Sequence, residues 1–188
     1  WCTSEGDFSL RYPAIWDSIL LSGHHITGVA SSDSHKAKGH PLWALGCVRT
    51  WIYADNLSER GILDGIKRGR VYMAKGKAKM DFYASLEERK AYMGESVCKK
   101  DIVGFNVELE EVPEGNLFVY ISGELENVVH FKDGNHKWSF LIKELPDREE
   151  NYIRLEYYDA PMPPRYWGDA PRSQDNLRLL SNPIFIRK

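Results

Sequence analysis

An aspartate and a histidine two positions apart are the first residues in this sequence that could do chemistry. Asp33 and His35 close the stretch GVASSDSH at residues 28–35, where a short apolar run gives way to polar side chains. Because alternate side chains of an extended chain point to the same side, the carboxylate and the imidazole would face one way. Both groups are good ligands for divalent metal ions. The pair predicts half of a metal site; a turn-capping aspartate beside a solvated histidine is the alternative.

Two nearby residues are candidates for substrate contacts. His40 follows in the loop after the motif, where it would reach a substrate or simply be solvated. Arg49 stands in a strand-like stretch and offers a planar guanidinium to an anionic group, and a structural salt bridge explains it equally well. His24 and His25 precede the motif. We expect both to be structural, because neighbouring strand residues point to opposite faces.

The elements that must position these residues lie in the first part of the chain, residues 1–77. A helix is expected over 11–23, followed by a short buried strand over 25–32 that leads directly to Asp33. The expected buried face of this helix consists of Ile15, Ile19 and Leu20. Active sites of α/β barrels and open sheets gather at the carboxyl ends of strands, which is where Asp33 would stand.

A second helix is signalled between two further strands. Ser58 can cap its first free N–H groups, and Gly69 suits the left-handed conformation at its end. β-branched and aromatic residues mark strands within 46–54 and 71–74, on either side of the helix. Strand, helix and strand in this order predict parallel α/β structure.

From residue 78 the sequence follows a period of two. Apolar and polar residues alternate in short runs at 104–111, 116–124 and 152–159. Asp133-Gly134 is a dipeptide suited to a tight turn and predicts a hairpin between its flanking strands. These patterns predict an antiparallel sandwich or a small barrel.

The composition is that of an ordinary globular protein. Of the 188 residues, 43% are hydrophobic and 28% are charged, and the net charge is −2. No apolar run is long enough to cross a membrane, and no basic block with interleaved aromatic residues predicts nucleic-acid binding. Cys2, Cys47 and Cys98 form no CxxC pair, so we expect reduced thiols in a cytoplasmic protein.

The order of several motifs carries a family resemblance. They are Ser-Asp-x-His at 32–35, Gly-x-x-Arg-Thr at 46–50, a helix capped at Leu57-Ser58, Gly-Arg-Val-Tyr at 69–72, Arg-x-Glu at 154–156 and Ser-Asn-Pro-Ile at 181–184. Together they resemble the C-terminal end of the PHP metallohydrolase superfamily, and more closely its carbaryl-hydrolase-like (CehA/McbA-type) branch. The resemblance spans nearly the whole chain but begins in the middle of the family's catalytic domain.

The resemblance implies a fold in two parts, α/β followed by all-β. Residues 1–77 would be the closing section of a PHP-type distorted β/α barrel, and residues 78–188 would be an antiparallel β-sandwich accessory domain. The remaining metal ligands of the family come from earlier segments. Since Trp1-Cys2-Thr3 is not a translation start, we expect a fragment that lacks a complete site and is inactive by itself.

The function implied for the intact protein is metal-dependent hydrolysis of ester bonds, in the manner of a phosphoesterase. Asp33 and His35 would both be ligands of a cluster of divalent ions (Zn, Mn or Fe), and Asp33 is also a candidate base for the attacking water. The substrate would be a small-molecule ester, phosphorylated in most of the family. Nucleic acid and membrane are not expected partners.

A binding module is the alternative function. The β-rich part would bind a carbohydrate or a protein on a catalytically inactive PHP-like remnant. Its expected aromatic surface consists of Tyr157, Tyr158, Tyr166 and Trp167. Packing in the core explains most aromatic residues of a globular protein and is the competing interpretation of these four.

Overall fold

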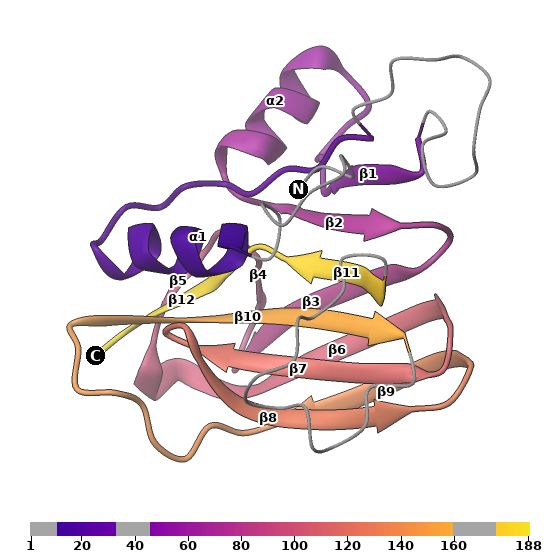
Figure 1. The fold of residues 1–188 in the computed structure, drawn as a ribbon. Helices are drawn as coiled ribbons and strands as arrows, with labels where there is room; N and C mark the ends of the chain where they lie inside the picture. The colour runs from indigo at the N-terminus through magenta and orange to yellow at the C-terminus, as the bar shows by residue number, and fades with distance from the viewer. Residues whose placement is uncertain (1–10, 33–45, 160–175) are drawn as a thin grey trace.

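The computed structural model of the chain describes residues 11–32, 46–159 and 176–188. Its elements in chain order are α1 (Arg11–Leu21), β1 (Val48–Ile52), α2 (Glu59–Lys67), β2 (Val71–Lys75), β3 (Lys79–Leu86), β4 (Lys90–Tyr92), β5 (Ser96–Cys98), the 3-10 turn η1 (Lys99–Asp101), β6 (Ile102–Val112), β7 (Gly115–Ile121), β8 (Glu124–Phe131), β9 (Gly134–Phe140), β10 (Glu150–Asp159), β11 (Leu177–Ser181) and β12 (Ile184–Arg187). The strands form two sheets, of eight and four strands, which we call the large sheet and the small sheet (Figure 1).

β10 is the central strand of the large sheet. One of its edges pairs with β12 and then with β11, and its other edge pairs with β7. β11 extends the sheet to β2 and β1, β12 extends it to β5, and β7 extends it to β8. All these pairs are antiparallel except β12 with β5. The strand beside β10 is therefore divided into two pieces, β11 and β12, which have different outer neighbours.

The small sheet has the order β4-β3-β6-β9 and packs its apolar face against the large sheet. Ile153, Leu155 and Tyr157 of β10 point into the core between the sheets, as their alternation predicts. The small sheet contributes fully buried rings such as those of Phe82 and Phe105. The antiparallel sandwich predicted from the period of two is confirmed, and the described part of the chain is mostly β.

The opposite face of the large sheet is also buried, which the period of two does not predict. The alternate side chains of β10, each at most 2% exposed, belong to Tyr152, Arg154, Glu156 and Tyr158. α1 covers part of this face, where Leu20 packs against Tyr152 and Phe185. In Figure 1, α1 lies beside β10 and β12, and the chain that follows it runs toward α2 and β1. The large sheet is thus a middle layer.

The parallel α/β unit predicted around α2 is wrong. β1 and β2 are antiparallel neighbours, with Val48 opposite Lys75 and Ile52 opposite Val71. The N–H of Tyr53 donates to the carbonyl of Arg70 at 2.8 Å, so the connection through α2 begins and ends at one place, as in a hairpin. β2 also pairs with β11, which ties the first 77 residues to the sandwich by main-chain hydrogen bonds. The division into domains at residue 78 stays a prediction.

The predicted hairpin at Asp133-Gly134 is wrong as well. β8 pairs with β7 in the large sheet, whereas β9 pairs with β6 in the small sheet. The turn is present, and Gly134 has the positive φ of 121° that favours glycine. It carries the chain from one sheet to the other, because β8 pairs in the large sheet and β9 in the small sheet.

The two helices occur where the sequence predicts them. The Ser58 hydroxyl accepts a hydrogen bond from the N–H of Gly61 at 3.0 Å at the start of α2, and Gly69 has φ +69° after its end. In α1 the buried side differs from the expectation: Ile15 is 52% exposed, whereas Asp17 is buried. No helix in the described residues is long and apolar enough to cross a membrane.

Candidate functional site

Residues 24–32, which we call the linking segment, lead from α1 to the predicted ligand Asp33. The strand expected over 25–32 is not formed, because the main chain here bonds to side chains instead of to a neighbouring strand. The Asn182 side chain accepts a hydrogen bond from the N–H of Gly28 at 2.7 Å and donates one to its carbonyl at 2.8 Å. The Thr50 hydroxyl does the same for Ala30, at 2.8 and 2.9 Å. Two side chains therefore replace a strand ladder.

Asn182 occupies the break between β11 and β12. Before it, Leu179–Ser181 face β2; after it, Phe185–Arg187 face β5. The side chain of Asn182 is 1% exposed and makes a third hydrogen bond, from Nδ2 to the carbonyl of Val71 at 2.9 Å. One end of the amide accepts from an N–H and the other end donates to two carbonyls, which identifies the oxygen and the nitrogen. Pro183 follows, and its carbonyl accepts a hydrogen bond from the N–H of Gly94. The break between β11 and β12 is therefore held by hydrogen bonds to neighbouring segments.

The linking segment lies between α1 and the large sheet and contacts both. A Cβ atom on Gly28 would meet the Trp16 ring at 3.0 Å and the Met73 side chain at 3.1 Å. Trp16 also donates its indole N–H to the carbonyl of Ile26 at 2.9 Å. A larger residue at position 28 would therefore have to displace the Trp16 ring or the Met73 side chain by a few tenths of an ångström.

His25 fastens the start of the linking segment. Its ring stacks on Phe185 with centroids 3.6 Å apart, and its Nε2 lies 2.6 Å from a carboxylate oxygen of Glu150. Two residues on, the Thr27 hydroxyl donates to the carbonyl of Ile66 near the end of α2. The expected structural role of His25 agrees with these contacts.

A buried ionic cluster joins α1 to β10. The Arg154 guanidinium binds both carboxylate oxygens of Asp17, one of them at 2.7 Å, and also binds Glu156. The hydroxyls of Tyr152 and Tyr158 donate at 2.8 Å to Asp17 and Glu156 respectively. Burial by itself lowers the pKa of Arg154, but the two carboxylates outweigh it, so the pKa is raised and the guanidinium stays charged. This cluster explains why a charged residue lies on the inner side of α1.

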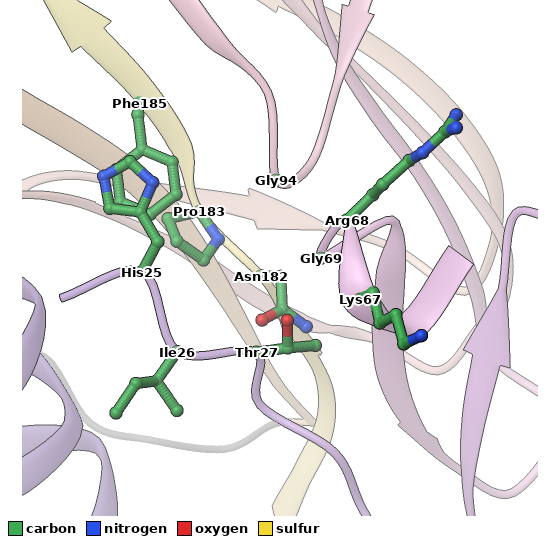
Figure 2. A pocket seen from close by; sticks show the side chains of 10 residues that line it. All are labelled: His25, Ile26, Thr27, Lys67, Arg68, Gly69, Gly94, Asn182, Pro183 and Phe185. Atoms are coloured by element: carbon green, nitrogen blue, oxygen red, sulfur yellow. The ribbon is translucent and has the colours of Figure 1, made fainter. Parts of the chain in front are cut away.

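A pocket of about 130 Å³ opens beside the linking segment (Figure 2). The stacked rings of His25 and Phe185 and the ring of Pro183 form one side, and Gly69 and Gly94 line the other. The Lys67 and Arg68 side chains extend away from the space between these walls. The amide of Asn182 and the hydroxyl of Thr27 already have the partners described above. The polar groups of Asn182 and Thr27 in this pocket therefore serve to hold the linking segment against its neighbours.

The predicted site residues fall into two groups. Asp33, His35 and His40 lie outside the described residues. Arg49 is described: its guanidinium donates to the carbonyls of Gly46 and Gly76, each at 2.8 Å, and it is exposed at the end of β1. Its neighbour Thr50 is the residue of β1 that bonds the linking segment. Within the described residues the partners of Arg49 are these two main-chain carbonyls. Its salt bridge and its contact with an anionic substrate both stay predictions.

A metal site is not formed within the described residues. No three side chains of the types His, Cys, Asp or Glu lie together there in a way that could hold an ion. The ionic cluster of Asp17 and Glu156 does not fit a cation either, because Arg154 lies between the two carboxylates.

The aromatic surface expected for a binding module is wrong for its two described members. Tyr157 is 0% exposed in the core, and its hydroxyl donates to the carbonyl of Pro113 at 2.6 Å. Tyr158 is 2% exposed and packs edge-on against Phe118. Tyr166 and Trp167 lie outside the described residues.

Sequence reasoning missed the side chains that hold the linking segment. Asn182 belongs to a recognisable Ser-Asn-Pro-Ile motif, but the motif does not reveal that its partner lies 154 residues earlier. Thr50 follows Arg49, which attracted attention through its charge. The buried Asp17 carried one available signal, because it shares a helical face with Pro13 and Leu20 while being charged.

Comparison with known proteins found one family model that matches part of the chain. A family model described as PHP-associated matches residues 20–71, which include the linking segment, β1 and α2. No curated protein and no solved structure gave a significant match. Residues 20–71 thus match a region that is associated with the polymerase and histidinol phosphatase (PHP) family.

Proposed function

We propose that this chain is the C-terminal part of a PHP-type metal-dependent hydrolase of the carbaryl-hydrolase-like branch. The observation that carries the proposal is the PHP-associated match over residues 20–71, which contains the Ser-Asp-x-His motif. The anchored main chain of Gly28 and Ala30, just before that motif, supports it. A segment fixed in this manner suits residues that must be held in place for chemistry.

In this proposal Asp33 and His35 are ligands from this chain to a divalent metal cluster, and other ligands come from a preceding part of the protein. A bound cluster would supply a water whose pKa is lowered from about 15.7 toward roughly 7. Asp33 would hold or accept the proton of that water, and His35 would bind as neutral imidazole. His40 and Arg49 are the proposed contacts to a small phosphorylated ester.

The proposal is tested on the natural full-length protein by metal analysis and by metal-dependent hydrolysis of p-nitrophenyl phosphate. Asp33→Ala and His35→Ala should each lose bound metal and hydrolysis. Ser34→Ala is the matched control, since it lies between them and should retain both. Metal content unchanged in both alanine variants would remove the site assignment. Binding of an oligosaccharide without metal by the same protein would instead favour the binding-module alternative.

A further inference from the structure

We infer that Asn182 and Thr50 are positioning residues that place the Asp33–His35 pair, acting through the main chain of the linking segment. This inference rests on the proposed function and assigns a role to two residues outside the metal motif. Asn182 binds the N–H and carbonyl of Gly28, and Thr50 binds the N–H and carbonyl of Ala30. The two anchored residues precede Asp33 by five and three positions.

The chemistry of Asn182 matches this task closely. Its carboxamide carries an acceptor and donors on one planar group, and these bond both main-chain groups of Gly28 at once. The second N–H of the same amide reaches the carbonyl of Val71, so one side chain bonds both the linking segment and β2. Aspartate has the same shape but no donor, and it would leave the carbonyls of Gly28 and Val71 without a partner.

The location of Asn182 indicates positioning as distinct from sheet formation. The residue lies between β11 and β12 and is not a member of either strand's ladder. Its neighbour Ser181 has the contrasting role: the Ser181 hydroxyl accepts from the N–H of Leu155 inside the sheet, at 2.8 Å. Both residues are at most 1% exposed, so Ser181→Ala is a matched control for the loss of buried hydrogen bonds.

The Thr50 anchor supplies an independent variant. Thr50→Val keeps the shape of the side chain and removes both bonds to Ala30 without placing a charge in the protein. It acts from β1 on Ala30, two residues beyond the residue that Asn182 bonds. If Asn182→Asp fails to fold, Thr50→Val still tests whether loosening the linking segment affects the metal pair.

The experiment uses the natural full-length protein with Zn²⁺ as the probe. Hydrogen exchange of residues 26–32 and the Kd for Zn²⁺, measured by chelator competition, are compared for Asn182→Asp, Thr50→Val and Ser181→Ala. Exchange should rise in the first two variants only. Their Zn²⁺ affinity should fall by roughly 10- to 100-fold, as for other residues that orient metal ligands, and should stay near the wild-type value in Ser181→Ala.

Two outcomes separate this inference from the proposed function. Faster exchange at residues 26–32 with Zn²⁺ affinity equal to that of Ser181→Ala would overturn the positioning role while leaving the metal site intact. Zn²⁺ binding that is unaffected by Asp33→Ala and His35→Ala would overturn the proposed function, and the positioning role with it. A parallel fall in affinity for both anchor variants, absent in the control, supports the inference.

Discussion

The sandwich and the linking segment are held in place by different kinds of bond. The strands of the sandwich pair through main-chain ladders, which any residue except proline can join. The linking segment has its main chain bonded to the side chains of Asn182 and Thr50. A ladder tolerates substitution because the bonding groups are in every residue, whereas an anchor fails with a single mutation. The comparison teaches that the position of the linking segment depends on a few side chains, each of which makes bonds that no other residue duplicates in the described part of the chain.

The largest effect is expected at Arg154, which joins α1 to the central strand of the sandwich. Arg154→Ala would leave the carboxylates of Asp17 and Glu156 buried without their cation, and breaking a buried pair in this way costs about 3–5 kcal/mol. Chemical denaturation should show a fall of this size in the free energy of unfolding. Arg60→Ala on the surface of α2 is the control and should change little, because Arg60 is 93% exposed. Equal effects in both variants would contradict the role given to the cluster.

A truncation in the core should weaken the sandwich as a whole. Leu155 is 0% exposed, and Leu155→Ala should lower the free energy of unfolding by about 2–5 kcal/mol through lost contacts and a cavity. Leu57→Ala makes the same chemical change at a side chain that is 96% exposed, and it should be nearly neutral. Hydrogen exchange should accelerate throughout the ladders in the first variant. Acceleration confined to residues 24–32 would contradict the assignment of Leu155 to the stability of the sandwich as a whole.

A change at Trp16 should loosen the linking segment alone. Trp16→Phe removes the hydrogen bond to the carbonyl of Ile26, which is worth about 1 kcal/mol. The matched control is Trp51→Phe, because the indole N–H of Trp51 is buried and has no hydrogen-bond partner among the described residues. Exchange at residues 26–30 should rise in the first variant and not in the second. A rise spread over the small sheet would count against local anchoring.

The smallest effect is expected at Asp81, on the small sheet. Burial raises the pKa of Asp81, and the hydrogen bond from Tyr53 only partly opposes the shift. A carboxyl whose pKa is raised in the folded state favours folding when protonated, so this stability is lost as pH rises through the folded pKa. Asp81→Asn should therefore slightly raise the free energy of unfolding at neutral pH, and the gain should vanish in acid. Asp101→Asn, at an exposed residue, is the control in the same pH series.

The sequence predicts elements well and long-range bonds poorly. The alternation of Ile153, Leu155 and Tyr157 is enough to assign β10 and its core face, because packing repeats with the period of the strand. The same pattern misreads Arg154 and Glu156, since a charged residue is expected to face water unless its partner is known. The partner, Asp17, is 137 residues away. The side chains that set the approach to Asp33 were unpredictable for the same reason.

The two connections that the sequence predicts wrongly also depend on distant parts of the chain. The β1–α2–β2 unit and the Asp133-Gly134 turn both have the local signals of a familiar motif. The direction of a strand and the sheet that it joins depend on the strands with which it pairs. Those partners lie elsewhere in the sequence: β2 pairs with β11, and β9 pairs with β6. Local chemistry thus predicts a turn or a helix but leaves the choice of partner to the completed fold.

The distance along the chain between Gly28 and Asn182 has a consequence for biosynthesis. A ribosome exposes residues 24–32 early, yet the amide that holds them emerges only after 154 further residues. Until the last two strands are made, Gly28 lacks the side chain that bonds its N–H and carbonyl. Contacts of such high sequence separation form late and slowly. We therefore expect Gly28 to acquire its two hydrogen bonds to Asn182 among the last contacts of the fold.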